Sequence, residues 1–337
     1  RQHFGVEDLP PLLGVGHHHA HAASYFLSPF EDATVLVMDG YGDDAATSVY
    51  RGEGNQLHRE SRTTIFNSLG ILYTVLTQYL GFKPNQDEGK VMGLAAYGRP
   101  TFVEAFRDLL QLKPDGGYQV NMKYFWYDCY GLARALKPRF VKRFGPPRGT
   151  DEPLTGHHQD IAFALQTIVE EAILHFVNAL TRRMPSQNLV LTGGVALNCV
   201  ANAKILEQTN IERIWIPPNA SDTGAPLGSA LWHYHQQLGK PRTFELTHPH
   251  YGVEYSDDEI ATALREAGLE ATRLPREELI EQTARDIAAG RIVGWFQGRF
   301  EMGPRALGNR SILADARRVD MKDVLNRRVK HREPFRP

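Results

Sequence analysis

Residues 33–40, Ala-Thr-Val-Leu-Val-Met-Asp-Gly, contain the pattern on which the predicted fold depends. The run is short, apolar and rich in β-branched residues, and it ends in Asp39 and Gly40, so it predicts a buried strand with a carboxylate at its carboxyl end. The run at 189–192 precedes a Gly-Gly pair in the same way. The run at 211–216 ends at two prolines and predicts a third buried strand.

Helical patterns separate these strands. Apolar residues recur at helical spacing from about 158 to 182 and predict one long amphipathic helix, and residues 70–80 are helical in pattern too. Strands that alternate with helices predict an α/β fold, whose ligands usually bind beyond the carboxyl ends of the strands.

The length of 337 residues predicts two domains, at about 150 residues per domain. Prolines and polar residues interrupt the periodicity around 240–257, and a new alternation then begins with helices at 257–268 and 276–290 and a strand at 292–296. We therefore predict domains at 1–243 and 244–337. The chain begins at Arg1 and stops at Pro337 in the middle of a polar, Arg-rich stretch, so we expect a piece of a longer protein.

The composition excludes several classes of protein. Cys129 and Cys199 are the only cysteines, so neither a disulfide framework nor a four-cysteine zinc site can form, and we expect a cytoplasmic protein. No apolar run approaches the roughly 18 residues of a membrane span. The 38 basic and 39 acidic residues give no overall attraction to nucleic acid or membranes. The sequence makes no prediction about the oligomeric state.

Residues 299–336 nevertheless contain eleven Lys and Arg against five Asp and Glu. Such a local excess indicates either a solvated basic face or a site for a phosphate-bearing small molecule. Arg305 and Arg310 lie five residues apart among glycines and suit bidentate binding of an anion, to which Lys330, Arg332 and Arg336 add charge.

Four histidines lie at 17, 18, 19 and 21. On a helix, His17 and His21 share a face and can bind one metal ion, and the strand-end carboxylates of Asp39 and Asp222 are the candidate partners. Two histidines and two carboxylates suit Fe²⁺, Mn²⁺ or Zn²⁺ alike. The alternatives are a surface histidine tract and ordinary Asp-Gly turns. A zinc peptidase is excluded because His18 stands where its helix needs Glu.

The sequence Gly193-Gly194-Val-Ala-Leu-Asn198 follows a predicted strand and opens a helix, a geometry in which backbone N–H groups approach a nucleotide. Residues 87–90, Asp-Glu-Gly-Lys, are similar to a P-loop fragment, but Val91 replaces the required Ser or Thr, so we predict no P-loop.

Six motifs occur in one order: 17–24, Asp39-Gly40, 67–70, 87–95, 193–198 and 303–311. This order resembles the NodU/CmcH family of O-carbamoyltransferases over nearly the whole chain. The resemblance implies a metal-binding domain of the actin-like ATPase (ASKHA) fold, followed by part of an α/β YrdC-like domain.

The resemblance also implies a reaction. The YrdC-like domain would make carbamoyl adenylate from carbamoyl phosphate and ATP, with Mg²⁺ as a possible companion of ATP. The metal domain would then transfer the carbamoyl group to the hydroxyl of a small-molecule acceptor and release AMP. The acceptor itself is not predicted.

Matching positions imply the residue roles. The metal ligands, with iron the implied ion, are His17, His21, Asp39 and Asp222. The nucleotide cradle includes Gly193, Gly194 and Asn198, and the contacts to carbamoyl phosphate and adenylate are Arg305, Lys330 and Arg336. Asp39, Asp222 and Arg305 are the implied catalytic residues, and either aspartate is also a candidate general base.

Two alternatives stay open at this point. One is a non-catalytic scaffold that binds a nucleotide and a metal. The other is a carbamoyltransferase of the hydrogenase-maturation type, which acts on a protein thiol and carries a zinc finger that two cysteines cannot supply.

Overall fold

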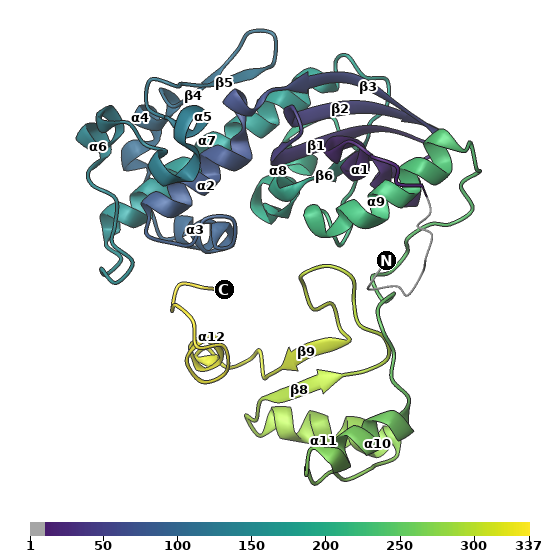
Figure 1. The fold of residues 1–337 in the computed structure, drawn as a ribbon. Helices are drawn as coiled ribbons and strands as arrows, with labels where there is room; N and C mark the ends of the chain where they lie inside the picture. The colour runs from purple at the N-terminus through teal and green to yellow at the C-terminus, as the bar shows by residue number, and fades with distance from the viewer. Residues whose placement is uncertain (1–10) are drawn as a thin grey trace.

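The structure is a computed structural model that describes residues 11–337, and its centre is a mixed five-stranded sheet (Figure 1). Strands β3, β2 and β1 are antiparallel, whereas β1, β6 and β7 run parallel. In sheet order the strands are β3 (Gln56–Thr63), β2 (Ala45–Glu53), β1 (Asp32–Gly42), β6 (Asn188–Thr192) and β7 (Arg213–Trp215). The predicted α/β class and its three strands are confirmed, with the third strand shorter than the run at 211–216.

The register of the parallel strands positions the site. Val37 of β1 pairs with Thr192 of β6. Asp39 and Gly194 each lie two residues further on, so they emerge side by side at the carboxyl ends of adjacent strands. This is the edge at which α/β sheets usually bind ligands.

Two strands of the sheet were not anticipated from the sequence. β2 is buried along nearly its whole length although it contains Thr47, Ser48 and Arg51, while β3 is an edge strand with mostly exposed polar side chains. Neither shows a clear apolar run or a strict alternation. Pairing with β1 places β2 in the sheet, and pairing with β2 places β3 at its edge.

Helices cover the sheet, and the two predicted for this region are confirmed. They are α2 (Leu69–Tyr79) and α7 (Gly156–Leu180), and α7 begins with a capping box between Thr155 and His158. The remaining helices near the sheet are α1 (His17–Ala22), η1 (Ala23–Leu27), η2 (Ile65–Asn67), α3 (Glu88–Ala95), η5 (Gly194–Leu197), α8 (Cys199–Gln208), η6 (Asp222–Gly224), α9 (Ala225–Leu231) and the π-helix η7 (Trp232–Gln237).

A mostly helical segment extends the core on the far side of α7 in Figure 1. Buried aromatic side chains, including Phe106, Phe125 and Phe140, join it to the apolar cluster around α2 and α7. Its elements are η3 (Pro100–Phe102), α4 (Val103–Arg107), β4 (Leu110–Leu112), β5 (Tyr118–Val120), α5 (Tyr127–Tyr130), η4 (Gly131–Arg134) and α6 (Pro138–Phe144).

The C-terminal region, residues 244–337, forms a smaller α/β layer below the first in Figure 1. The predicted helices and strand are confirmed, and β9 pairs antiparallel with β8. The elements are α10 (Asp257–Glu266), α11 (Arg276–Ala288), β8 (Val293–Phe296), β9 (Arg310–Leu313), α12 (Met321–Val324) and the π-helix η8 (Leu325–Val329).

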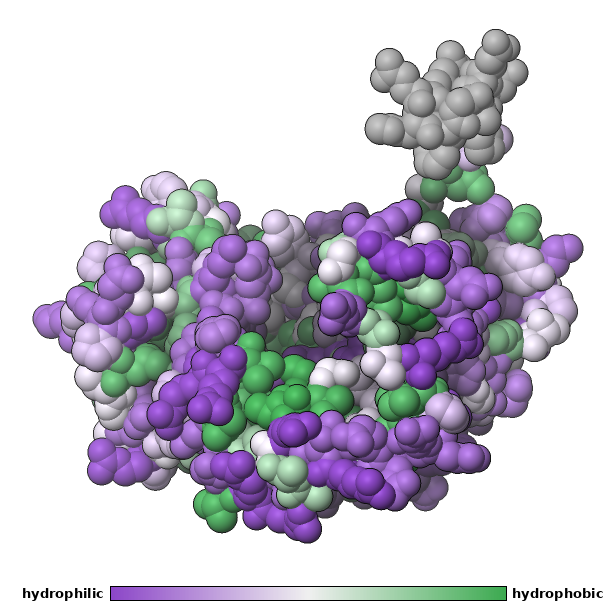
Figure 2. All heavy atoms as spheres, turned by 90° about the horizontal axis from the view of Figure 1, so that it is seen from below, coloured by the Kyte–Doolittle hydropathy of each residue, from purple (hydrophilic) through white to green (hydrophobic). Residues whose placement is uncertain are grey.

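Among the described residues, no helix or strand lies between Gln237 and Asp257. The domain boundary near 243 stays a prediction. Figure 2, viewed from the side of the C-terminal region, shows apolar side chains exposed among polar ones. No helix within residues 11–337 is both long enough and apolar enough to cross a bilayer.

Candidate metal and nucleotide site

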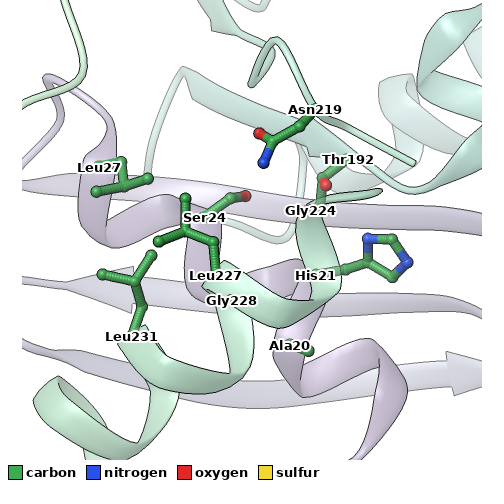
Figure 3. A pocket seen from close by; sticks show the side chains of 10 residues that line it. All are labelled: Ala20, His21, Ser24, Leu27, Thr192, Asn219, Gly224, Leu227, Gly228 and Leu231. Carbon is green, nitrogen blue, oxygen red and sulfur yellow. The ribbon is translucent and has the colours of Figure 1, made fainter. Parts of the chain in front are cut away.

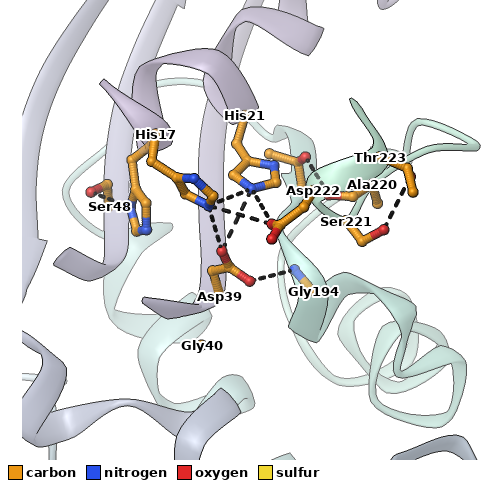
Figure 4. Close-up of polar contacts among 12 residues, drawn as sticks. His17, His21, Asp39, Gly40, Ser48, Gly194, Ala220, Ser221, Asp222 and Thr223 are labelled. Carbon is orange, nitrogen blue, oxygen red and sulfur yellow. Dashed lines mark hydrogen bonds and ion pairs between the residues drawn. The ribbon is translucent and has the colours of Figure 1, made fainter. Parts of the chain in front are cut away.

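Four side chains predicted as metal ligands converge at the carboxyl end of β1 (Figure 4). The Nε2 atom of His17 lies 2.8 Å from Oδ2 of Asp39 and 3.4 Å from Oδ1 of Asp222. The Nε2 atom of His21 lies 3.5 Å and 3.4 Å from the same two oxygens and 3.1 Å from Nε2 of His17. The structure thus brings together residues that are up to 205 positions apart in the chain.

Local features of the sequence let these side chains meet. Helix α1 has no capping side chain of its own, and the backbone N–H of His17 donates instead to Oδ2 of Asp43 at 2.6 Å. Gly42 has to be glycine, because a Cβ there would lie 2.0 Å from the His17 ring. Gly228 of α9 likewise lets that helix approach the carbonyl of Ala20 in α1.

Charge and burial differ among the four side chains. His21 is 1% exposed and Asp39 is 10% exposed, whereas Asp222 is 74% exposed. Burial by itself would raise the pKa of Asp39, but hydrogen bonds with His17 and His21 and from the backbone of Gly194 lower this pKa far below its ordinary value. The hydrogen bond to Asp39 in turn raises the pKa of His17, against the opposing effect of burial.

The donor set fits a divalent metal ion. The donor atoms of the four residues lie within 4.8 Å of one another, and the five distances above fall between 2.8 and 3.5 Å. Donors that surround a four-coordinate ion at bonds of about 2.0–2.2 Å are separated by about 3.4 Å. Two imidazole nitrogens with two carboxylate oxygens suit iron, manganese and zinc, so this group can hold a metal but does not select one.

The other two histidines of the tract do not join this group. His18 is buried and its Nδ1 lies 2.8 Å from Oγ of Ser48, and burial lowers the pKa of His18 to about 4. The His19 ring stacks on Trp232 with ring centroids 4.3 Å apart. The helix therefore divides the tract into two ligand candidates and two packing residues, as the spacing predicts.

The glycine turn after β6 lies directly beside the four side chains. The backbone N–H of Gly194 donates to Oδ1 of Asp39 at 3.0 Å. Gly193 has a φ of 91°, and a Cβ there would lie 2.2 Å from the carbonyl oxygen of Met38, so only glycine fits. The turn and the carboxylate are thus built as one unit.

Asn198, the third predicted nucleotide contact, is already engaged within the protein. Its Oδ1 accepts from the backbone N–H of Ala201 at 3.1 Å and caps α8, and its Nδ2 donates to Gln166 at 3.1 Å. Its side chain thus holds the glycine turn against α7. Sequence reasoning missed Gln166, which lies inside a regular helical pattern and gives no signal of its own.

A small pocket lies beside the metal ligands, with the His21 ring at its edge (Figure 3). It is lined mainly by α1, η1 and α9 and has room for about one water molecule. Oγ of Ser24 is buried there without a hydrogen-bond partner among the described residues. The pocket is too small for a substrate.

Arg305 lies on a separate loop in the C-terminal region, where it is exposed. Glu301, which sequence reasoning missed, holds this loop: its Oε1 accepts from the backbone N–H groups of Leu307 at 2.9 Å and Asn309 at 2.7 Å. At Gly303 the loop meets the N-terminal region, since a Cβ there would lie 2.0 Å from the carbonyl oxygen of Pro218. The Arg305 loop therefore contacts the segment that leads to Asp222.

Lys330 and Arg336 lie on the C-terminal segment. Burial lowers the pKa of Lys330, and the neighbouring charges of Arg332 and Arg336 lower it further, so these three cations lie close together. Among the described residues, no hydrogen bond or ion pair joins Arg305 to Lys330 or Arg336. That Arg305, Lys330 and Arg336 bind one ligand stays a prediction.

Comparisons with known proteins agree on one family. The family model described as carbamoyltransferase N-terminus matches residues 3–231, and the carbamoyltransferase C-terminus model matches residues 284–337. Nodulation protein NolO of Bradyrhizobium diazoefficiens is 36% identical over 96% of this chain and 57% of its own length.

Two further relatives show the range of the similarity. The uncharacterized protein sll1178 of Synechocystis is 44% identical over 98% of this chain and 55% of its own length. The 3'-hydroxymethylcephem-O-carbamoyltransferase of Streptomyces clavuligerus is 30% identical over 76% of this chain and 44% of its own length. The chain spans about half the length of the curated relatives it matches.

Proposed function

Because the chain belongs to the NodU/CmcH carbamoyltransferase family, we propose that the protein of which it is part is an ATP-dependent O-carbamoyltransferase. Carbamoyl phosphate, water and ATP would give carbamoyl adenylate, phosphate and pyrophosphate. An acceptor hydroxyl would then attack the carbamoyl carbon, and AMP would leave. The relative that is named a cephem O-carbamoyltransferase supports a small hydroxylated acceptor.

The observation that carries this proposal is the convergence of His17, His21, Asp39 and Asp222 beside the Gly193–Gly194 turn. A divalent ion bound by these four residues, with Fe²⁺ our first candidate, would supply Lewis-acid chemistry at the transfer site. The glycine turn offers backbone N–H groups to an adenylate phosphate. We further propose that the N-terminal region has the actin-like ATPase fold, which its mixed sheet supports.

The two carboxylates would have different roles. Asp39 is nearly buried and fixed by His17, His21 and Gly194, so it orients the histidines and cannot turn toward an acceptor. The side chain of Asp222 is largely exposed. An acceptor hydroxyl can therefore approach Asp222, which is the better placed of the two to take the hydroxyl proton.

We place adenylate formation in the C-terminal region, as part of a YrdC-like domain. Arg305 is exposed on a loop that Glu301 holds rigid, and Lys330 and Arg336 form part of a cationic cluster. Fixed positive charges suit a small dianion such as carbamoyl phosphate, since they stabilise the charge that develops as phosphate leaves.

Isotope exchange with the full-length protein tests this assignment. Labelled pyrophosphate should enter ATP in the presence of carbamoyl phosphate, and Arg305→Ala should lower that exchange at least about 100-fold. His21→Ala should spare the exchange but block transfer to an acceptor and remove bound metal, which elemental analysis measures. The matched control is His19→Ala, on the same helix, which should retain both the metal and the transfer.

Two outcomes would contradict the proposal. Absence of any carbamoyl phosphate-dependent exchange in the unaltered protein would favour a non-catalytic scaffold. If Arg305→Ala and His21→Ala stop the exchange equally, the division of chemistry between the two regions is wrong.

A further inference from the structure

The C-terminal segment contacts helix α3 of the N-terminal region, and the C-terminus lies close to α3 in Figure 1. Nζ of Lys90 in α3 lies 2.9 Å from Oε1 of Glu333. Phe335 packs edge to face on Phe82, with ring centroids 6.2 Å apart. Lys90 belongs to the Asp-Glu-Gly-Lys sequence that lacks the features of a P-loop, and neither the metal site nor the glycine turn uses it.

Glu333 lies among cations in the chain. Lys330 and Arg336 are each three residues away from it, and Arg332 precedes it directly. The backbone N–H of Arg336 donates to the carbonyl oxygen of Glu333 at 3.1 Å, so the two residues lie in one turn. Burial would raise the pKa of Glu333, but the hydrogen bond to Lys90 and the charges of Lys90 and Arg336 lower it below its ordinary value.

A buried side chain folds the cationic segment into a compact turn. Nε of Arg332 donates to Oδ1 of Asn326 at 2.6 Å, and Nδ2 of Asn326 donates to the carbonyl oxygen of Arg336 at 2.9 Å. Asn326 is 1% exposed. The turn therefore keeps the three positive charges together, at a cost in repulsion that an anion would relieve.

The Glu333 carboxylate is the internal anion that could relieve this repulsion. It is the only acidic side chain in residues 330–337, and its Oε2 atom is buried without a hydrogen-bond partner among the described residues. Its other oxygen is bound to Lys90. A carboxylate released from Lys90 would need only local rotation to pair with Arg336 or Lys330.

We propose that Lys90 is a positioning residue, which holds the Glu333 carboxylate on α3 and so leaves the charges of Lys330, Arg332 and Arg336 to a phosphate-bearing substrate. The inference rests on the proposed function for the identity of that substrate, carbamoyl phosphate, but the competition between Glu333 and an anion is a property of this chain alone. Nζ of Lys90 also lies 3.2 Å from Oδ2 of Asp87, which gives the lysine a second ion pair.

The Lys90→Gln variant tests this role, because it removes the charge and retains a long polar side chain. A partly exposed ion pair contributes little stability, so the variant should fold. Calorimetry with the full-length protein should show the Kd for inorganic phosphate rising about tenfold, the effect of one close competing charge. The KM for carbamoyl phosphate should rise equally in the exchange assay, with kcat changed less than about twofold.

Rescue separates this role from a structural one. Lys90→Arg should keep both constants within about twofold of the unaltered protein, because an arginine can hold the same carboxylate. The double variant Lys90→Gln with Glu333→Gln should also recover phosphate binding, since the competing carboxylate is gone. The matched control is Lys322→Gln, which removes a second lysine that bridges the two regions, through Tyr97 at 3.0 Å, and should leave phosphate binding unchanged.

Each contrary result is specific. An unchanged phosphate Kd in Lys90→Gln, or a double variant as weak as the single one, would overturn the positioning role. If the unaltered protein binds phosphate in the expected way but shows no exchange with carbamoyl phosphate, the proposed function fails while the role of Lys90 stands.

Discussion

The N-terminal region and the C-terminal region of this chain bury different kinds of side chain. The first packs large apolar residues around α2 and α7 into a continuous core. In the second, α10 and α11 contain no buried residue, and its buried side chains include the polar Glu301, Asp315 and Asn326. The comparison indicates that apolar packing stabilises the first region, whereas hydrogen-bonded polar side chains fix the conformation of the second.

The largest expected effect tests the apolar side of this comparison. Leu165 in α7 is fully buried, so Leu165→Ala should lower the free energy of unfolding by about 2–5 kcal/mol through lost burial and the remaining cavity. Leu279 in α11 is 42% exposed, and Leu279→Ala should change the free energy of unfolding by less than about 0.5 kcal/mol. Denaturant titrations of the two variants measure the difference.

Equal losses of stability in the two variants would contradict the comparison. They would mean that a partner or a further segment covers α11 in solution and gives the C-terminal region an apolar core. The Leu279→Ala variant is thus the more informative member of the pair, because exposed apolar side chains gather in this region.

The polar side of the comparison predicts sensitivity to acid. Burial alone would raise the pKa of Glu301, but hydrogen bonds from the backbone N–H groups of Leu307, Asn309 and Arg310 lower it to about 2, against an ordinary value of 4.5. Because this pKa is lowered on folding, the ionised Glu301 carboxylate stabilises the folded loop. This contribution is complete above pH 4.5 and is lost as the pH falls through about 2. The Arg305 loop should therefore loosen within this interval.

Hydrogen exchange of residues 303–310 between pH 5 and 2 measures this loosening, after correction for the intrinsic pH dependence of exchange. Glu301→Gln removes the titrating group, so its loop should be weakly protected at every pH, with no transition. A transition of the same size in Glu301→Gln would assign the acid sensitivity to another group. A loop that stays protected at pH 2 in the unaltered protein would refute the role of Glu301.

Much of this fold could be predicted from the sequence because its signals are local. β1, β6 and the long helix α7 show apolar runs or helical periodicity that their own residues generate. β2 and β3 could not be predicted, because their polar residues take strand conformation through pairing, of β2 with β1 and of β3 with β2. The sheet order likewise depends on contacts between distant segments.

The candidate site divides in the same way. The spacing of His17 and His21 predicts a shared helical face, and the Asp-Gly and Gly-Gly turns indicate the ends of the neighbouring strands β1 and β6, so the approach of Asp39 could be anticipated. The sequence also predicts Asp222 at a strand end, but Asp222 lies in η6, beyond the end of β7 at Trp215. Two further contacts could not be anticipated: the hydrogen bond of Asn198 with Gln166 and the hydrogen bonds of Glu301 with its loop. Each joins a side chain to partners that no local sequence pattern indicates.

The smallest expected effect compares two helix caps, one from each region. Asn198 caps α8 and also bonds to the buried Gln166, whereas Ser256 caps α10 through a capping box with Glu259 in solvent. Ser256→Ala should destabilise α10 by about 1 kcal/mol, the usual value of an N-cap. Asn198→Ala should cost about 1 kcal/mol more, since it also removes the hydrogen bonds with Gln166, which keeps Tyr73 and Glu170 as partners.

Hydrogen exchange resolves the two helices separately, so each loss can be measured in the intact chain. Ser256→Asp, which keeps an oxygen acceptor at the N-cap, is the matched control and should retain the protection of α10. If Ser256→Ala reduces protection in α10 as much as Asn198→Ala does in α8, the exposed cap contributes more to helix stability than its local hydrogen bonds explain. The contrast between a region stabilised by apolar packing and a region fixed by hydrogen-bonded polar side chains would then not extend to the helix ends of the two regions.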